Sequence, residues 1–511
     1  MGLADTQKQI SPAELDAGLR RLMFDAAFAT IVGTLNSGVV LIAYALWLGA
    51  SPAVIGLLAA IPFLTQLLQA PTVLLLEKVR SRRLVSVAGV FIARLALPLI
   101  AFLAFLPDKN AALLLLVIGE TIHCAFNAVG GCAWNSWMRD FIPERRLSDF
   151  FARRTIWATM LGIGGTVTAA AALELSPPDR NGGTVFFALY FGGFLASLIS
   201  SWQLSKVPEP EVEREPARQS LAALFAMPLK DSRFRPLIRF TASWQFTVNL
   251  SLPFFTVYLI RQLDYSAGFV LLLSIVSQFS NMVVLRDWSR LSNLFASKTV
   301  LAVSAPIFIA AIAGMAFAGQ FESRIVTTIY LIGLHAIMGM ASAGVALASS
   351  TIGLKLAPKG TANVYIATNA LVTAAAAGTA PLIAGLFADF FARRQLSLQM
   401  LWRTPEGTVD LVAISFGWWQ FFFLISAATG LYALHRLSFV REEGEVRPRE
   451  LVQHVLNVAR RGVRNASPVA GLRAAVSFPA GGVLESHRRR IRAAGETEGT
   501  PESERPDHAS A

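Results

Sequence analysis

The stretch that decides the fold is AALLLLVIGETIHCAFNAVGGCAWNSW, residues 111–137. Its 27 residues include one acidic side chain, Glu120, and no Lys or Arg. A helix rises 1.5 Å per residue, so about 20 apolar residues cross the hydrocarbon core of a bilayer. This run is therefore predicted to be a membrane-spanning helix.

Similar runs fill most of the chain. Of 511 residues, 54% are hydrophobic and only 15% are charged, whereas soluble proteins carry about 25% charged residues. This composition excludes a soluble globular enzyme. Twelve spans are predicted, near residues 25–48, 53–76, 84–106, 111–137, 155–173, 183–204, 237–260, 266–285, 299–318, 325–354, 362–388 and 413–436.

The spans are predicted to be helices, because backbone groups in hydrocarbon must be hydrogen-bonded within the protein and the runs lack the alternation of barrel strands. The fold class is thus an all-α membrane protein. The net charge of +12 comes from basic residues in short loops rather than on one surface, so no nucleic-acid partner is expected. Twenty Lys and Arg lie in the loops on one side and seven on the other. The positive-inside rule places both termini in the cytoplasm.

A Pro- and Glu-rich stretch at residues 208–216 divides the spans into six and six. The expected organisation is a cytoplasmic N-terminal segment (1–24), a first bundle (25–207), a linker (208–236), a second bundle (237–438) and a partly disordered cytoplasmic tail (439–511). An amphipathic run at residues 450–461 either lies on anionic lipid or forms part of a solvated tail.

The two halves repeat. Polar and structural landmarks recur at offsets of 212 to 215 residues, and two six-span copies in the same orientation are related by a pseudo-twofold axis along the membrane normal. Such copies enclose a cleft with a site at mid-membrane. The matched pairs are Asn36 with Asn249, Tyr44 with Tyr258, Gly56 with Gly268, Gln66 with Gln278, His123 with His335, and Pro143 with Pro358.

The run Ala133-Trp-Asn-Ser-Trp-Met-Arg-Asp-Phe-Ile-Pro143, followed by Arg146 and Arg154, resembles a signature of a bacterial branch of the major facilitator superfamily. The superfamily's loop motifs after spans 2 and 8 are altered here. The resemblance covers about residues 20–438. It implies two six-helix bundles, a cavity lined by spans 1, 4, 7 and 10, and a monomeric transporter in the bacterial inner membrane. The implied partners are a small-molecule substrate, protons and membrane lipids.

Three ionisable residues inside spans are candidates for proton coupling, because such groups are costly in hydrocarbon and tend to face a cavity or a partner. Glu120 and His123 lie three residues apart on one helix face. Either they exchange protons with the cavity, or Glu120 belongs to a structural ion pair. Arg94 lies at a similar depth and is the expected partner of Glu120. It could instead bind an anionic substrate or extend toward the membrane surface.

The candidate substrate-binding residues share hydrogen-bonding side chains within predicted spans. Amide and phenol groups suit an uncharged polar or aromatic solute, although the same groups also join neighbouring helices. His335 mirrors His123 and either contacts the solute or packs between helices. The set comprises Asn36, Tyr44, Asn127, Gln245, Asn249, Tyr258 and His335.

No ATP-binding loop or zinc motif occurs in the sequence, so neither a cofactor nor a metal is expected. The function predicted is secondary active transport of a small solute by alternating access, with protons as the expected coupling ion and the direction of transport left open. Two alternatives remain. One is a membrane-embedded enzyme or lipid-handling protein that uses Glu120 and His123 as acid and base, and the other is a non-transporting receptor whose basic tail binds a partner.

Overall fold

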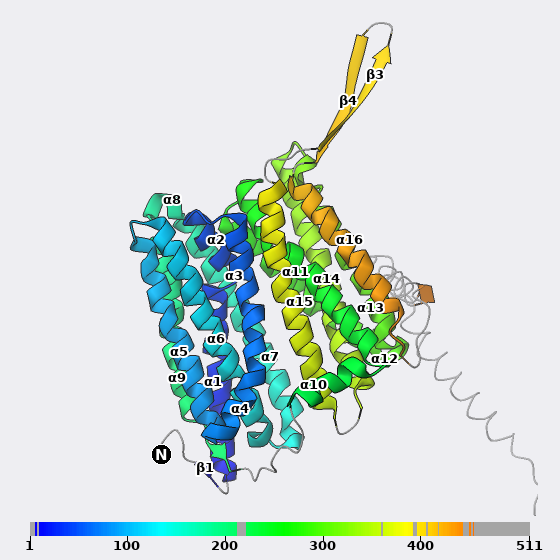
Figure 1. Cartoon of the computed structure of the whole chain (residues 1–511). Helices are drawn as coiled ribbons and strands as arrows, with labels where there is room; N and C mark the ends of the chain where they lie inside the picture. The colour runs from blue at the N-terminus through cyan, green and yellow to red at the C-terminus, as the bar shows by residue number, and fades with distance from the viewer. Residues whose placement is uncertain are drawn as a thin grey trace, which may run out of the picture. The chain divides into compact units, whose positions relative to one another are not determined.

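The computed structural model describes residues 6–7, 10–211, 221–358, 361–391, 396–404, 407–416, 418–442, 449–450 and 453. The chain divides into two units, Met1–Val446 and Arg447–Ala511. The membrane-spanning helices found among the described residues lie in the first unit (Figure 1). The amphipathic run predicted at residues 450–461 lies almost wholly outside the described residues, as do residues 212–220 of the linker.

The first bundle is formed by six spans, several of which consist of more than one helix. Its elements are α1 (Pro12–Asn36), α2 (Val39–Trp47), α3 (Pro52–Leu64), η1 (Thr65–Leu68), α4 (Gln69–Val79), α5 (Arg82–Phe102), η2 (Leu103–Phe105), α6 (Lys109–Phe141), α7 (Glu144–Leu175), α8 (Pro178–Asn181) and α9 (Thr184–Ser205). A short parallel pair, β1 (Thr6–Gln7) with β2 (Glu209–Pro210), lies at its edge.

The second bundle repeats this order after the short helix α10 (Leu221–Lys230). Its elements are α11 (Arg235–Arg261), α12 (Ala267–Phe295), α13 (Ser297–Met315), η3 (Ala318–Gln320), α14 (Arg324–Leu356), α15 (Ala362–Phe391) and α16 (Trp418–Ser438). Among the described residues, eleven segments are long and apolar enough to cross a membrane. The twelfth is α11, whose 27 residues span as far but include polar side chains such as Gln245 and Asn249.

Span 1 is broken in its middle. Helix α1 ends at Asn36, and Gly38, with φ +60° and ψ −125°, is the N-cap residue just before α2. This positive φ is costly for residues other than Gly. The break was not predicted, and it leaves the first backbone amides of α2 without partners in their own helix.

A β-hairpin separates the last two spans, where the sequence predicted only a loop. Strand β3 (Leu396–Thr404) pairs antiparallel with β4 (Gly407–Phe416), with an irregularity between Leu398 and Met400. The predicted start of span 12 at residue 413 is therefore wrong, because residues 413–416 belong to β4 and the helix begins at Trp418. Figure 1 shows the hairpin projecting beyond the helix ends.

The bundles meet through two equivalent close contacts. A Cβ added to Gly56 of α3 would lie 2.2 Å from the carbonyl oxygen of Pro381 in α15. A Cβ added to Gly268 of α12 would lie 2.8 Å from the carbonyl oxygen of Ala170 in α7. These glycines are partners in the sequence repeat, so α3 against α15 and α12 against α7 are the same interface generated twice. The predicted pseudo-twofold architecture is confirmed.

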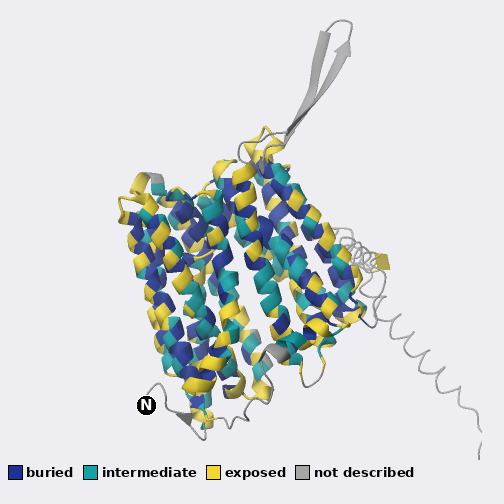
Figure 2. Ribbon diagram, in the orientation of Figure 1, coloured by how far each residue is buried: buried dark blue, intermediate teal, exposed yellow. Residues whose placement is uncertain are grey.

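Repeated aromatic residues also fill equivalent places inside each bundle. Tyr44 of α2 stacks on Phe186 of α9, with ring centroids 4.6 Å apart. Tyr258 of α11 packs against Phe423 of α16, with centroids 5.3 Å apart. Both tyrosines are fully buried. Figure 2 shows exposed residues along the helices of both bundles. Many of them are large apolar residues, as expected where lipid is the solvent.

Each bundle closes with a glutamate that caps its third span. After α9, the carboxylate of Glu209 accepts hydrogen bonds from Ser81 Oγ at 2.8 Å and from the amides of Arg82 and Arg83 at 2.7 and 3.2 Å. After α16, Glu442 accepts from the Lys298 amide and from Lys355 Nζ, both at 2.7 Å. A carboxylate at a helix N-terminus satisfies its free amides and opposes its dipole.

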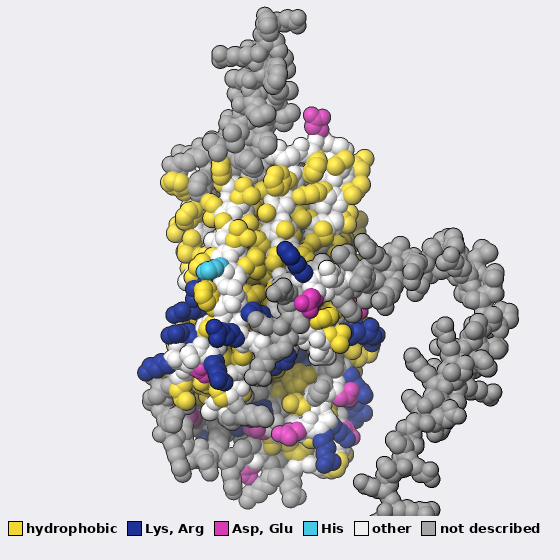
Figure 3. Space-filling model, turned by 90° about the vertical axis from the view of Figure 1, so that its right-hand side faces the viewer, with side chains coloured by type: hydrophobic (Ala, Val, Ile, Leu, Met, Phe, Trp, Pro, Cys, Tyr) yellow, Lys and Arg dark blue, Asp and Glu magenta, His cyan; other side chains and the backbone are white. Residues whose placement is uncertain are grey.

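These two glutamates are a further repeat that the sequence comparison missed. Each follows a buried valine by two residues, Val207 and Val440. Their offset exceeds that of the other pairs because the β3–β4 hairpin lies between spans 11 and 12 of the second copy only. Both capping sites lie at the end of the helices that carries the connections α4–α5, α6–α7, α9–α11, α12–α13 and α14–α15, here called the basic end. Figure 3 shows Lys and Arg gathered toward this end and apolar side chains above it.

Replacing Glu209 by Gln should lower the melting temperature of the purified protein by several degrees. An amide nitrogen cannot accept the Arg82 or Arg83 hydrogen bonds, and losing a buried charged acceptor costs about 1–3 kcal/mol. Glu442→Gln should have a similar effect. Glu211→Gln is the matched control, because Glu211 is exposed two residues away. Melting of Glu209→Gln at the same temperature as Glu211→Gln would contradict the capping role.

Candidate functional site

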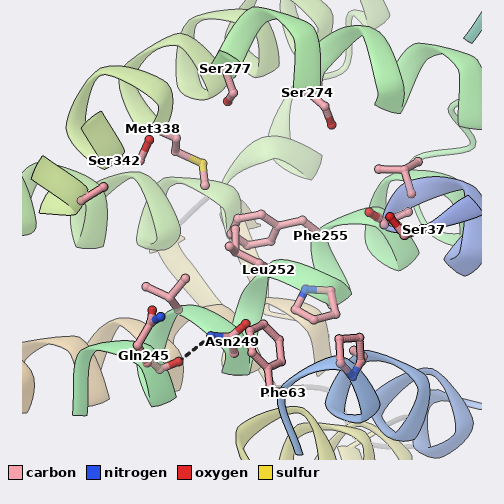
Figure 4. A pocket seen from close by; sticks show the side chains of 18 of the residues that line it. Ser37, Phe63, Gln245, Asn249, Leu252, Phe255, Ser274, Ser277, Met338 and Ser342 are labelled. Atoms are coloured by element: carbon pink, nitrogen blue, oxygen red, sulfur yellow. Dashed lines mark hydrogen bonds between the residues drawn. The ribbon is translucent and has the colours of Figure 1, made fainter. Parts of the chain in front are cut away.

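A cavity of about 1000 Å³ lies between the bundles. The second bundle supplies most of its wall, through α11, α12, α14 and α15, with one residue from α13. The first bundle contributes Ser37–Val39 at the break in span 1, further residues of α2 and α3, and Glu120 of α6. Figure 4 shows the side chains of α11 and α12 that project into it. The predicted central site thus has a space that a small solute can occupy.

Three of the predicted substrate-binding residues line this cavity. Gln245 and Asn249 lie one turn apart on α11, and the Asn249 Nδ2 donates to the Gln245 backbone oxygen at 2.8 Å (Figure 4). His335 lines it from α14, with its Nδ1 2.8 Å from the Leu331 carbonyl oxygen. Because a carbonyl only accepts, Nδ1 carries the proton, and Nε2 is left as a hydrogen-bond acceptor in the neutral ring.

The other four predicted substrate-binding residues are not among the described residues that line the cavity. Asn36 is buried and donates to the Tyr190 backbone oxygen at 3.2 Å. The Tyr44 hydroxyl donates to the Ile100 oxygen at 3.1 Å. Asn127 contacts the ring of His123, and Tyr258 is buried among the aromatic residues of α16. Asn36, Tyr44 and Tyr258 therefore pack between helices, which was the alternative interpretation of each, whereas Asn127 contacts a residue of its own helix.

Glu120 is the only acidic residue among the described residues that line the cavity. Its side chain is 3% exposed, and its Oε1 accepts a hydrogen bond from the Cys124 thiol at 3.2 Å. Within the described part of the chain, no Lys or Arg forms an ion pair with it. The hydroxyl of Tyr190, which interacts electrostatically with Glu120, is buried without a hydrogen-bond partner there. The carboxyl group therefore lies at the edge of the cavity without a Lys or Arg partner in the described residues, and it interacts electrostatically with His123 one turn away on α6.

His123 does not face the cavity together with Glu120. Its Nδ1 lies 2.8 Å from the Ala93 carbonyl oxygen, and its Nε2 lies 3.0 Å from Asn127 Nδ2. The carbonyl requires a proton on Nδ1, so Nε2 accepts from the Asn127 amide. Both nitrogens of the neutral ring are thus occupied between α5 and α6. This arrangement fits a neutral histidine that joins two helices.

Arg94 does not form the expected pair with Glu120. Its guanidinium donates to the Ser197 carbonyl oxygen at 2.8 Å, to Ser201 Oγ at 2.6 Å and to Ser200 Oγ at 2.8 Å. Ser200 Oγ in turn donates to Asp25 Oδ1 at 2.5 Å. The hydroxyl of Ser200 therefore bridges Arg94 on α5 to Asp25 on α1. Two residues at the same depth in the membrane can lie on helix faces that point away from each other. Counting residues along each span gives the depth but not the direction of the side chain.

Asp25 was missed because it stands at the predicted start of span 1, where an acidic residue is unremarkable. In the structure α1 begins at Pro12, and Asp25 lies within the bundle with 5% of its surface exposed. Arg154 of α7 also interacts electrostatically with Asp25, and its guanidinium stacks over the Trp134 ring at 4.8 Å. The buried carboxylate is thus compensated from two helices.

Several other lining residues were not selected from the sequence. Ser274, Ser277 and Gln278 of α12 line the cavity. Gln278 did carry a signal, because it is one of the repeat landmarks. Ser37 and Gly38 are a small polar pair in the middle of an apolar run, which is the available indication of the break in span 1.

The comparisons with known proteins agree with this architecture. Residues 26–381 match the family model described as Major Facilitator Superfamily. The chain belongs to this superfamily. It is therefore a multi-pass membrane transporter of a small molecule. Among curated proteins no sequence matches the chain.

Solved transporter structures share the major facilitator fold at low sequence identity. A variant of the nucleoside transporter NupG matches with a TM-score of 0.63 and 14% identity, over 83% of this chain and 100% of that chain. The D-xylose-proton symporter matches with a TM-score of 0.58 and 14% identity, over 85% and 99%. A bacterial homologue of the human lysosomal transporter Spinster, inward-facing and unoccupied, matches with a TM-score of 0.57 and 16% identity, over 85% and 100%. These likenesses concern the fold.

Arg94→Met should destabilise the protein by about 3–5 kcal/mol, because it removes a cation from the buried Asp25 carboxylate. Adding Asp25→Leu should recover part of this loss. A thermal-unfolding double-mutant cycle should therefore give a large coupling energy for Arg94 with Asp25. The same cycle for Arg94 with Glu120→Gln should give a coupling near zero. Strong coupling to Glu120 instead would contradict the network described above.

Proposed function

We propose that this superfamily member is a secondary active transporter of the bacterial inner membrane. It moves a small solute by alternating access and couples that movement to protons through Glu120. The observation that carries the proposal is the position of Glu120, a nearly buried carboxyl group that borders the central cavity without a Lys or Arg partner among the described residues. An isolated charge is costly in a nearly buried site within the membrane. The stability of each conformation of the transporter therefore depends on whether the Glu120 carboxyl group is protonated.

The contacts between the bundles support alternating access. Two hydrogen bonds join them at the end opposite the basic end, from Arg261 Nη2 to the Ala50 oxygen at 2.9 Å and from Ser266 Oγ to Glu174 Oε2 at 2.6 Å. The glycine contacts of Gly56 and Gly268 lie in the same half of the molecule. Hydrogen bonds of this kind can break and re-form as two rigid bundles rock.

The cavity wall extends toward the basic end. It includes Ser349 and Ser350, within two turns of the end of α14, and Asn369 and Thr373 near the start of α15. A conformation joined at one end, with polar lining toward the other, fits the state that is open to the basic side. In the proposed cycle, rocking breaks the Arg261 and Glu174 hydrogen bonds and opens the opposite end.

The role of the proton follows from the cost of enclosing a charge. When the cavity closes, an ionised Glu120 would lose access to water with no cation to replace it. Protonation of Glu120 removes this cost. The protonated transporter therefore converts more readily between the conformations open to either side of the membrane. The membrane potential supplies about 2.3 kcal/mol per charge per 100 mV, in addition to the pH gradient. Both ring nitrogens of His123 already have partners, Ala93 and Asn127, so Glu120 is left as the proposed coupling group.

Glu120→Gln should abolish uphill accumulation driven by a pH gradient in proteoliposomes. The amide mimics the protonated carboxyl group, so downhill flux and exchange of labelled solute should remain. Glu322→Gln is the matched control, because Glu322 is exposed in a connection at the opposite end. The same substitution there should leave accumulation unchanged. Normal pH-driven accumulation by Glu120→Gln would show that the proton is carried elsewhere.

The proposed orientation can be tested by cysteine labelling. In a background with Cys124→Ser and Cys132→Ala, Glu322→Cys should react with a membrane-impermeant maleimide in intact cells. Glu211→Cys, at the basic end, should react only after the membrane is permeabilised, since the positive-inside rule places that end in the cytoplasm. The opposite labelling pattern would reverse the topology and place both termini outside.

A further inference from the structure

We propose that the transported solute is an uncharged molecule with hydrogen-bond donors and acceptors, and that the second bundle recognises it through Gln245, Asn249, Gln278 and His335. The first bundle then supplies the proton site rather than the solute site. This inference rests on the proposed transport function and specifies the substrate class of the same cavity.

The charges of the lining argue against an anion. Among the described residues that line the cavity, none is a Lys or an Arg. Arg94 is held by serine residues of α9, and Arg261 donates to a backbone oxygen at the far end of α11. A phosphate or carboxylate would therefore enter the cavity without a cation to offset its lost hydration, at a cost of several kcal/mol.

A permanent cation is disfavoured by the proposed mechanism. Glu120 is the only lining carboxyl group among the described residues, and it must be neutral when the loaded cavity changes its open side. A bound cation would then lose its counter-charge at the step at which the cavity is closed to water. Solute and proton would compete for one carboxylate, whereas an uncharged solute leaves Glu120 free to bind the proton.

Some hydrogen-bonding side chains that line the cavity already have partners within the protein, and others do not. The hydroxyl of Ser277 donates to the His335 oxygen at 2.7 Å, and that of Ser274 to the Val270 oxygen at 3.2 Å, so both donors are occupied. The side-chain amides of Gln245 and Gln278 have no hydrogen-bond partner in the described part of the chain, and the same holds for Asn249 Oδ1 and His335 Nε2.

These free groups supply donors as well as acceptors. Each glutamine amide offers two N–H donors and one carbonyl oxygen, while Asn249 Oδ1 and the neutral His335 ring accept. In Figure 4 Gln245 and Asn249 lie on one side of the view and the serines of α12 on the other. A site that hydrogen-bonds a hydroxyl or amide rejects analogues lacking it, because its polar groups are then left unpaired. Apolar side chains such as Phe63 and Leu252 complete the wall.

The repeat shows why the two bundles differ. Asn249 and His335 face the cavity, whereas their partners in the first copy, Asn36 and His123, are bonded to Tyr190 and Ala93 inside the bundle. The same residue types at equivalent positions are thus used for recognition in one copy and for helix packing in the other. This asymmetry assigns solute specificity to the second bundle.

Binding to the full-length protein in detergent tests this without a gradient. Thermal shifts would be measured with pairs of an uncharged compound and its charged counterpart. The pairs are uridine with uridine monophosphate, glucose with glucose 6-phosphate, and a set of neutral amides with their carboxylate analogues. Tetraphenylphosphonium serves as the cation. We expect at least one uncharged compound to stabilise the protein and its charged counterpart to bind at least tenfold more weakly. Stabilisation by charged compounds only, or by none of the panel, would overturn the proposal.

Side-chain variants test the assignment to the second bundle. Gln245→Ala and Gln278→Ala should each weaken binding of the identified compound about tenfold, while Gln262→Ala, an exposed amide just beyond the end of α11, should not. Gln278 is itself exposed, so its variant should fold even if Gln245→Ala does not. Unchanged affinity in both cavity variants would place recognition elsewhere. Glu120→Gln should still bind the solute, so a failure of coupling and a failure of this assignment give different results.

Discussion

Every polar group at membrane depth must find its partner inside the protein, and this constraint organises the whole structure. It makes the spans helical, because a helix satisfies its own backbone. It also sorts the few buried polar side chains into two kinds of place. Arg94, Asp25 and Ser200 satisfy one another between helices of the first bundle, and Glu120, Gln245 and His335 meet the central cavity. The polar groups of the second kind border the space that a solute can enter.

The duplicated architecture fixes the scaffold but not the chemistry. Gly56 and Gly268 give the same close approach of helices at both interfaces, and Tyr44 and Tyr258 occupy equivalent aromatic cores. Positions of this kind hold the same residue type in both copies, because the two copies pack their helices with the same geometry. Residues that border the cavity are free of this requirement. Asn249 can face the solute space while its partner Asn36 joins two helices.

The spans, their grouping and four cavity residues, Glu120, Gln245, Asn249 and His335, were accessible from the sequence, since length, hydropathy, the repeat and polar side chains within apolar runs indicate them. The Arg94–Glu120 pair was wrong because helix depth says nothing about the direction in which a side chain points. Asp25 was overlooked because α1 starts thirteen residues before it, in a segment too polar to be recognised as part of a span. The break at Gly38 and the β3–β4 hairpin depend on backbone conformation, for which a single Gly or a short alternating run is a weak signal.

The glutamate caps have a consequence for how such a molecule can arise. Glu209 serves α5 of its own copy, and Glu442 serves α13 of its own copy, in each case from the segment just after the last span. At these two sites neither copy uses a capping group from the other. An ancestral six-helix polypeptide could therefore have capped its own third span before gene duplication, without a residue from a second copy.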